Sequence, residues 1–463
     1  MKKNNKFHQR RKLLGGGLAL GALGAFGKGS LLLSLGQMSQ AVAGTGNGDY
    51  KAIVCLFLDG GNDSFSMLVP IDSTSRALYE AARGAVGVGT PGLYPLIPDN
   101  AQPGGRQVAL HPEMAGLGPI FDAGRLAVVA AVGTLVEPVT RAKLEANQST
   151  LPRDLFSHEQ QAFQWQTVVN NGQLRGWGAR LADYVVNQNQ FAPATAISTF
   201  GQSPWLNGNL VSQFVVGGNG DVGSIASAGS RLDRATGQAE TRSNLLEQAY
   251  AASHDRLRDG ASAISSAILP VSAVPPVPNE LNSLAVQLRT VARMIGGRAS
   301  LGAGRQVFCC SVTGYDTHVD QLNLHNGLMR DLGQAMVYFD QALDHLGVSD
   351  KVTTFTASDF GRNLVANDGG TDHGWGSQQL VMGGAVNGRK IIGELPDLDA
   401  VNGSDIWRQN YIVPKIASDQ LGGSLGRWFG LNDAQLAEVF PNIANNGFDS
   451  LVIPGSISLF PDT

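Results

Sequence analysis

Two acid–histidine pairs stand in the second half of this 463-residue chain. One places Asp316 two residues before His318, the other places Asp372 directly before His373, and glycines flank both pairs. Carboxylates and imidazoles are common ligands of divalent metal ions, and the glycines allow the tight loops that such a site needs. The sequence therefore predicts a metal site, with Zn, Ca or Mg as the candidate ion.

Three further carboxylates follow apolar runs that are typical of strands. Asp59 and Asp63 surround a Gly-Gly-Asn turn after residues 52–58, and Asp359 closely follows residues 352–356. Ligands of doubly wound sheets bind beyond the carboxyl ends of the strands, so all three are candidate metal ligands. The alternative for Asp59 and Asp63 is a turn whose side chains bond their own backbone. Asp316 has a similar alternative, as the cap of a turn or helix.

Ser157, His158 and Arg362 are the candidate catalytic residues. Ser157 precedes a helical pattern and is a natural N-cap, but a hydroxyl at a helix N-terminus can also attack a phosphate or sulfate ester. His158 is a candidate metal ligand or acid–base group. Arg362 is expected to hold an oxyanion of the substrate in a bidentate fork. Asp372 is expected to fix the tautomer of its neighbour His373.

The elements that must position these residues follow an α/β pattern. Continuous apolar runs indicate strands that are buried on both faces, at 52–58, 126–132, 306–312, 352–356 and 380–382. Helical patterns at 280–295 and 319–346 alternate with them. This alternation predicts a doubly wound, mainly parallel sheet flanked by helices. The Gly-, Ser- and Pro-rich segment around 198–278 is interpreted as a cap insertion in a single domain, 44–463.

Residues 1–43 have the features of a twin-arginine signal peptide. Arg10-Arg11 precedes a long Gly/Ala/Leu-rich stretch, and Ala41-Val42-Ala43 suits a signal peptidase. We therefore expect passage through the Tat translocase to the periplasm or the cell exterior, with no permanent membrane span. The segment contains seven Lys and Arg and no Asp or Glu, so its removal lowers the formal net charge from −4 to −11. This acidic charge balance argues against a nucleic-acid partner.

The order of motifs resembles the domain-of-unknown-function family 1501, exported proteins placed distantly in the alkaline phosphatase and sulfatase superfamily. The matching stretches span most of the chain: Gly60-Gly61-Asn62-Asp63, Leu110-His111-Pro112, Ser157-His158 with Gln161, Gly176-Trp177, Gly314–His318, Asp359-Phe360-Gly361-Arg362, Gly370–Gly374, Arg427-Trp428-Phe429-Gly430 and Phe440-Pro441. The resemblance implies an alkaline-phosphatase-like fold with a metal site that cleaves phosphate or sulfate esters of small molecules or glycans.

The resemblance also implies roles for single residues. Asp59 or Asp63 would be the first metal ligand and Ser157 the nucleophile, and the late ligands would be Asp316, His318, Asp359 and His373. This chain departs from the superfamily in having Phe360 where a histidine often follows the aspartate, which reduces the number of imidazoles available to an ion. The alternative function is a non-catalytic envelope protein that keeps the fold and uses its cleft for binding or assembly.

Overall fold

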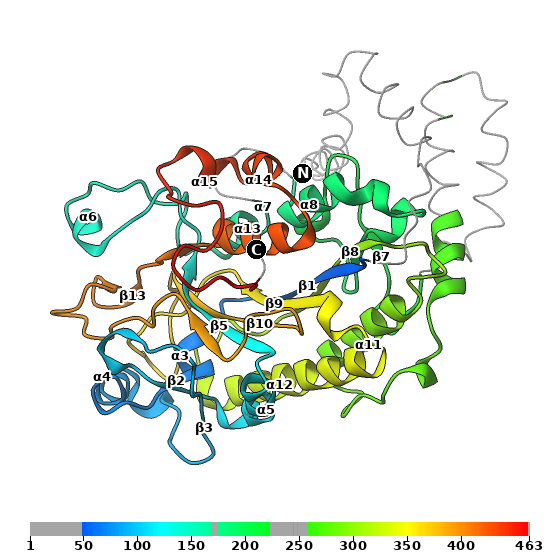
Figure 1. Cartoon of the computed structure of the whole chain (residues 1–463). Coiled ribbons are helices and arrows are strands. Elements are labelled where there is room, and N and C mark those ends of the chain that lie inside the picture. Colours follow the sequence, from blue (N-terminus) through cyan, green and yellow to red (C-terminus); the bar gives the residue numbers. More distant parts are fainter. Residues whose placement is uncertain (1–48, 168–174, 223–243, 245–247, 249–257, 462–463) are drawn as a thin grey trace, which may run out of the picture. The chain divides into compact units, whose positions relative to one another are not determined.

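The computed structural model describes residues 49–167, 175–222, 244, 248 and 258–461 (Figure 1). Contacts divide the chain into Met1–Gly44 and Thr45–Thr463, and every element described below belongs to the second unit. The predicted signal peptide, 1–43, lies outside the described residues. Within the described part of the chain, no helix is long and apolar enough to cross a membrane.

A nine-stranded sheet forms the centre of this unit. Its strands are β1 (Lys51–Leu58), β5 (Leu126–Gly133), β6 (Ala196–Ser198), β7 (Phe214–Val215), β8 (Arg305–Val312), β9 (Val352–Ser358), β10 (Ser377–Met382), β11 (Lys390–Ile392) and β14 (Ile416–Ala417). Their order is β11-β5-β10-β9-β1-β8-β6-β7, and β14 pairs with β5. The five apolar runs that predicted strands therefore all form strands of one sheet, and the doubly wound α/β prediction is confirmed.

The sheet is mainly parallel, and the direction of β10 is what makes it mixed. β1 pairs in parallel with both β8 and β9, whereas β10 runs antiparallel to β9 and β5. The carboxyl ends of β1, β8 and β9 therefore lie at the same edge of the sheet as the amino end of β10. Asp59, Asp316 and Asp359 follow the parallel strands, and His373 precedes β10.

Helices cover both faces of the sheet, as Figure 1 shows. One layer contains α5 (Gly118–Asp122), α11 (Ser283–Gly296) and α12 (Gln321–His345); the other contains α7 (His158–Thr167), α8 (Trp177–Val185), α13 (Ser418–Phe429) and α14 (Asp433–Val439). Side chains of β1 alternate between the two layers, Val54 and Leu56 on one side and Ile53 and Cys55 on the other. Because both faces of the sheet are buried, β1 and β5 are almost wholly apolar, whereas β9 and β10 also bury threonine and glutamine side chains.

Shorter elements surround the edge at which the candidate residues lie. They are α3 (Ser64–Met67), α4 (Ser73–Arg83), α6 (Arg141–Glu145), α15 (Pro441–Asn445), the small sheet of β2 (Leu68–Pro70), β4 (Val108–Leu110) and β3 (Tyr94–Pro95), and the hairpin of β12 (Ile406–Trp407) and β13 (Tyr411–Ile412). The hairpin contacts the segments that carry the candidate residues.

The predicted cap insertion, 198–278, is described only in part, because 223–243, 245–247 and 249–257 lie outside the described residues. One described piece, β7, adds a strand to the end of the central sheet beside β6. The cap therefore stays a prediction. The three cysteines, Cys55, Cys309 and Cys310, are buried with free thiols in β1 and β8.

The buried Asp419 in the first turn of α13 gives the fold a predictable pH dependence. Burial raises its pKa to about 7, against weak hydrogen bonds from Asn442 and Ser418. A carboxyl group whose folded pKa is raised stabilises the fold fully below its unfolded pKa, and this contribution is lost as the pH rises from about 4 to about 7. We expect Asp419→Asn to remove this loss and to raise the free energy of unfolding at pH 8 by up to about 4 kcal/mol.

Urea unfolding of wild type and Asp419→Asn at pH 5 and pH 8 measures the effect, with the exposed Asp449→Asn as the control. Equal pH dependence in wild type and Asp419→Asn would contradict the assignment.

Candidate metal centre

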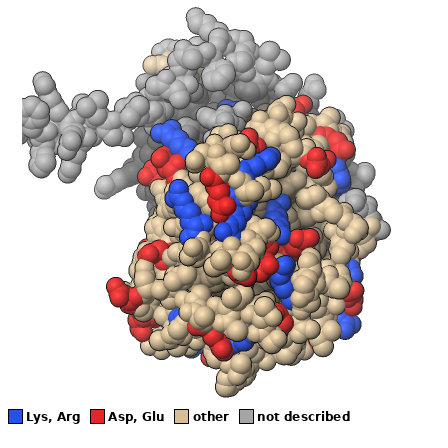
Figure 2. All heavy atoms as spheres, turned by 90° about the vertical axis from the view of Figure 1, so that its left-hand side faces the viewer, with Lys and Arg blue, Asp and Glu red and all other residues tan. Residues whose placement is uncertain are grey.

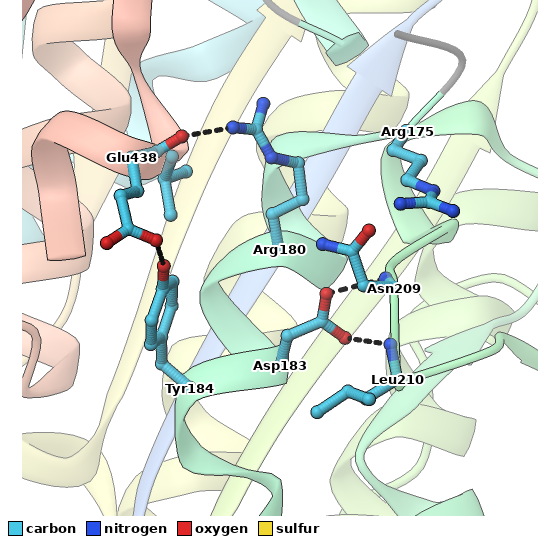
Figure 3. Close-up of a pocket in the computed structure, with 8 residues that line it drawn as sticks. Arg175, Arg180, Asp183, Tyr184, Asn209, Leu210 and Glu438 are labelled. Carbon is cyan, nitrogen blue, oxygen red and sulfur yellow. Dashed lines mark hydrogen bonds between the residues drawn. The ribbon is translucent and has the colours of Figure 1, made fainter. Parts of the chain in front are cut away.

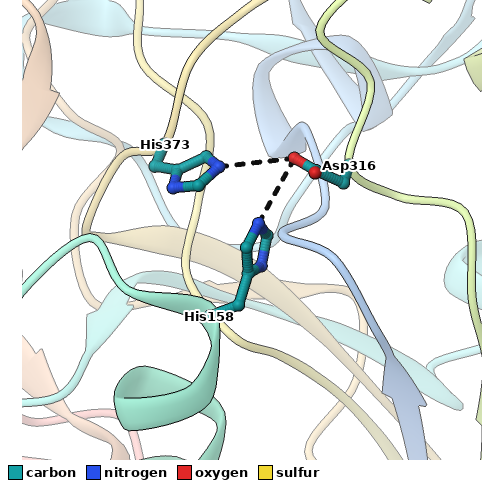
Figure 4. A group of neighbouring side chains, drawn as sticks. All are labelled: His158, Asp316 and His373. Atoms are coloured by element: carbon teal, nitrogen blue, oxygen red, sulfur yellow. Dashed lines mark ion pairs between the residues drawn. The ribbon is translucent and has the colours of Figure 1, made fainter. Parts of the chain in front are cut away.

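Three imidazoles surround one carboxylate oxygen at the carboxyl edge of the sheet. His158 Nε2 and His373 Nε2 each lie 3.4 Å from Asp316 Oδ1 (Figure 4). His318 Nε2 lies 2.9 Å from the same oxygen and 3.1 Å from His373 Nε2. His158, Asp316 and His373 can offer ligand atoms that all lie within 4.8 Å of one another. The four side chains come from three segments that are far apart in the sequence.

The first of these imidazoles, His158, is held by a buried carboxylate. Its Nδ1 lies 2.8 Å from Asp359 Oδ2, and Asp359 Oδ1 accepts a hydrogen bond from the backbone N–H of Gly60 at 3.2 Å. Because a carboxylate only accepts, the Nδ1 atom of His158 carries a proton. Its Nε2 is buried without a hydrogen-bond partner among the described residues, and faces Asp316. Asp359 was predicted to be a metal ligand; in the structure it instead orients the candidate ligand His158.

The other two imidazoles are held in the same way. His373 Nδ1 donates to the backbone carbonyl of Phe156 at 2.7 Å, and His318 Nδ1 lies 3.1 Å from Asp372 Oδ1. Each ring therefore turns Nε2 toward the common point. Asp372 was predicted to orient His373 but contacts His318 instead, because neighbouring side chains in an extended segment point in different directions.

The pKa values of His158 and His373 are shifted in opposite directions. The hydrogen bond to Asp359 raises the pKa of His158, against an opposing effect of burial. Burial lowers the pKa of His373, although its bond to the Phe156 carbonyl opposes this. Burial alone would raise the pKa of Asp316, but the guanidinium of Arg362 holds it below its usual range. Burial thus favours the neutral form of His373, and Arg362 favours the ionised form of Asp316, the forms in which these two side chains bind metal ions.

These distances fit a divalent ion. Tetrahedral zinc with bonds of about 2.0–2.1 Å places neighbouring ligand atoms about 3.3 Å apart. His158 Nε2 and His373 Nε2 each lie 3.4 Å from Asp316 Oδ1, and the ligand atoms of these three residues all lie within 4.8 Å of one another. Bonding of each Nδ1 to a carboxylate or a carbonyl is the usual support of a metal-bound histidine. Two imidazoles and one carboxylate match zinc better than calcium or magnesium, which favour oxygen ligands.

Arg362 does not lie as an oxyanion clamp would. Its side chain is fully buried, and Nη1 donates to Asp316 Oδ1 at 2.7 Å. Nε donates to the hydroxyl of Thr371 at 3.3 Å, and Nη2 donates to the Thr371 carbonyl. All three nitrogens are therefore engaged within the protein. In this arrangement Arg362 fixes the Asp316 carboxylate, rather than contacting a substrate.

Asp63 also takes a different role from the predicted one. Its two carboxylate oxygens accept from Arg83 Nη1 and Nη2, each at 2.8 Å, and neither side chain is exposed. Ser66 and Gln321 donate to the same carboxylate at 2.6 and 2.7 Å. Burial would raise the pKa of Asp63, but Arg83 lowers it. Both oxygens of Asp63 are thus engaged in a buried ion pair with Arg83, and we do not include Asp63 in the ligand set.

Asp59 and Ser157 lie beside the cluster. Burial and the neighbouring Asp359 raise the pKa of Asp59, whereas His158 opposes the shift, so these three side chains lie in one another's fields. Asp59 is half-buried. The carbonyl of Ser157 accepts from the Gln161 N–H at 2.9 Å, as that of an N-cap residue does, and Ser157 stands between Phe156 and His158.

Sequence reasoning assigned no structural role in the site to two aromatic residues, Phe360 and Phe156. Phe360 stacks on His373 with 4.7 Å between ring centroids and lies 4.8 Å from the ring of His158. It therefore forms an apolar wall under two of the three imidazoles. Phe156 supplies the carbonyl that holds His373. In the sequence, only the position of Phe156 directly before Ser157-His158 could have indicated that it belongs to the site.

A separate hollow of about 510 Å³ contains none of the predicted residues (Figure 3). It is lined by two arginines, two acids and four other side chains: Arg175, Arg180, Asp183, Glu438, Tyr184, Asn209, Leu210 and Val439. Both acids are engaged, since Asp183 accepts from the backbone N–H groups of Asn209 and Leu210 and Glu438 accepts from the Tyr184 hydroxyl. The hollow offers no imidazole, so the cluster around Asp316 is the better candidate for chemistry.

The face shown in Figure 2 carries charged side chains of both signs. Lys and Arg gather near its middle with Asp and Glu among them, and α4, α6 and β13 lie on this side in Figure 1. Interspersed charges produce a weaker long-range field than a patch of one sign.

The fold and the cluster define an α/β protein with a histidine–carboxylate group at the carboxyl edge of its sheet. The chain belongs to the family described as protein of unknown function (DUF1501), whose model matches residues 50–440, as the motif order predicts. No curated protein matches the chain.

Several solved structures resemble the chain. The PsFucS1 sulfatase from Pseudoalteromonas sp. is 10% identical, with 94% of this chain and 78% of that chain covered and a TM-score of 0.35. The lipoteichoic acid synthase LtaP from Listeria monocytogenes is 8% identical, with 83% and 72% covered and a TM-score of 0.32. The C-terminal periplasmic domain of EcEptC from Escherichia coli, in complex with Zn, is 9% identical, with 84% and 85% covered and a TM-score of 0.31. At TM-scores of this size the likeness supports no conclusion on activity.

Proposed function

We infer that the protein is an exported, divalent-metal-dependent hydrolase of phosphate or sulfate esters, carried by small molecules or glycans. The observation that supports this most directly is the convergence of three imidazole Nε2 atoms on Asp316 Oδ1, each imidazole being held through Nδ1. We assign His158, His373 and Asp316 as the ligand set, since their ligand atoms all lie within 4.8 Å of one another, with His318 beside Asp316 and zinc as the preferred ion. Three protein ligands leave one position of a tetrahedral ion for the ester oxygen. The expected place of action is the periplasm or the cell exterior.

The proposed mechanism is an in-line displacement: the Ser157 oxygen bonds to phosphorus or sulfur as the bond to the alcohol oxygen breaks, and the alcohol leaves with the hydroxyl proton. Water then cleaves the ester formed on Ser157 and releases phosphate or sulfate. An ion bound here would polarise an ester oxygen and stabilise charge that develops in the transition state. Ser157 is the proposed nucleophile, because it places a hydroxyl directly before His158 at the start of α7. Asp359 keeps His158 oriented, and Arg362 keeps Asp316 ionised and in place.

The test combines metal analysis with turnover of an aryl phosphate and an aryl sulfate. We expect about one zinc ion per chain and metal-dependent release of the phenol from at least one of the two esters. Ser157→Ala should keep the metal and lower kcat by roughly a thousandfold or more, since the attacking atom is removed. Loss of metal in Ser157→Ala would contradict its role as nucleophile. Wild-type protein without metal or turnover would overturn the proposal.

A second candidate function is a non-catalytic envelope protein that binds or assembles through this edge. The inward orientation of Arg362 favours it, because that guanidinium is not free to hold a substrate oxyanion. Bound metal together with no turnover of either ester would support this alternative.

A further inference from the structure

Phe156 has a backbone conformation that a bulky L-residue rarely adopts. Its φ angle is 78°, in the left-handed region that favours glycine. In this conformation its carbonyl accepts the hydrogen bond from His373 Nδ1 at 2.7 Å. Strained backbone persists where surrounding contacts determine it, and it concentrates at functional sites. The contacts that hold Phe156 therefore bear on the orientation of His373.

The ring of Phe156 packs against Tyr411, with 4.6 Å between centroids and 33° between the ring planes. Tyr411 belongs to β13 and lies opposite Trp407 of β12 in the hairpin. A swing of Phe156 to an ordinary φ would move its ring relative to its carbonyl. The aromatic contact thus opposes the relaxation that would withdraw the carbonyl from His373.

The β12–β13 hairpin is itself fixed to two segments of the candidate metal centre. The carbonyl of Asn410 accepts from the N–H of Leu364, two residues after Arg362, at 2.7 Å. The carbonyl of Ile412 accepts from the N–H of Gly376, three residues after His373, at 3.1 Å. The hairpin therefore contacts the segments that carry His158, Arg362 and His373.

The turn of this hairpin is also determined by its surroundings. Arg408 and Gln409, the first two residues of the three-residue connection, have φ angles of 51° and 57°, values that hairpin turns usually obtain from Asn and Gly. The guanidinium of Arg408 lies 4.3 Å from the centre of the Trp407 ring. A turn made without glycine indicates that the hairpin is held in one shape, as a rigid support for Tyr411 would require.

We propose that Phe156 and Tyr411 are positioning residues for His373: their ring contact keeps Phe156 in the left-handed conformation, so that its carbonyl binds the Nδ1 proton and Nε2 faces Asp316. This inference rests on the proposed metal centre and adds the means by which one ligand is oriented. It assigns the β12–β13 hairpin to the metal centre, although the hairpin supplies no ligand.

The test compares four variants by their zinc affinity, measured in competition with a chelator. Tyr411→Leu and Phe156→Ala should bind zinc about 10–100-fold more weakly, as when other supports of ligands are removed. Tyr411→Phe keeps the ring and should bind like wild type. Phe156→Gly loses the ring but adopts a positive φ without cost, so it should bind more tightly than Phe156→Ala.

The comparison of Phe156→Gly with Phe156→Ala distinguishes a positioning role from a packing role. If Phe156 acted only by packing, the smaller glycine would lower zinc affinity more than alanine. Phe460→Leu breaks another stacked pair, Trp428–Phe460, whose Trp428 lies by Lys51 at the amino end of β1, and is the matched control. It should leave zinc affinity unchanged. Affinity of Phe156→Ala equal to wild type, or of Phe156→Gly no better than Phe156→Ala, would overturn the proposal.

A second readout does not depend on bound metal. In metal-free protein, ¹⁵N NMR of the imidazoles should show His373 with its proton on Nδ1, and Phe156→Ala should shift His373 toward a mixture of tautomers. The same tautomer in both proteins would overturn the positioning role. Wild type that has the expected tautomer but binds no zinc would instead overturn the proposed function.

Discussion

Asp316→Ala is expected to abolish metal binding, from about one ion per chain to below roughly a tenth of an ion after gel filtration. The reason is geometric: Asp316 Oδ1 is the atom on which His158, His318 and His373 converge, within 2.9 to 3.4 Å. Without this carboxylate the ion loses one ligand and the negative charge that neutralises part of its own. Atomic emission spectrometry of the purified protein measures the metal content.

The control is a histidine outside the group. His345 is exposed in the last turn of α12, a 25-residue helix whose first residue follows the loop of His318, so it lies roughly 36 Å along the helix from the cluster. His345→Ala should keep its metal, and His373→Ala should lose it. Full metal content in Asp316→Ala would show that the ion, if present, is bound elsewhere.

Arg83→Met is expected to lower the free energy of unfolding by about 3–5 kcal/mol, the usual cost of removing one partner of a buried ion pair. Both partners, Arg83 and Asp63, have no exposed side-chain surface, and the guanidinium also donates to the carbonyl of Asn363 at 3.0 Å. The variant leaves the Asp63 carboxylate buried without its counter-charge. Urea unfolding in the presence of a chelator measures this effect apart from any metal.

The double variant Arg83→Met with Asp63→Asn is the matched control. It removes both charges, so it should be more stable than Arg83→Met alone. Asp63→Asn by itself should keep the metal, because both oxygens of Asp63 are bound to Arg83 and not directed at the cluster. A double variant less stable than Arg83→Met would mean that the carboxylate stabilises the fold without its partner.

The strands and the shared edge of the sheet could be predicted because their signals are local. Continuous apolar runs mark β1, β8 and β9, which are neighbours in the sheet. Asp59, Asp316 and Asp359 follow these parallel strands, so they had to emerge at one edge.

The full cluster could not be predicted, because it depends on contacts between distant segments. His373 reaches the same edge because β10 is antiparallel, and a short apolar run gives no direction. His158 meets Asp359 across 201 residues of sequence, from a helix and not from a strand. Arg83 resembles any arginine in the last turn of a surface helix, so nothing marked it as the partner of Asp63.

The three cysteines have a consequence for the conditions under which this chain can fold. Cys55, Cys309 and Cys310 remain thiols inside the packed strands β1 and β8, so the folded chain contains no covalent cross-link between cysteines. Its covalent structure is the same in a reducing and in an oxidising compartment. Folding can thus be completed before any transfer between two such compartments, with no oxidation step afterwards.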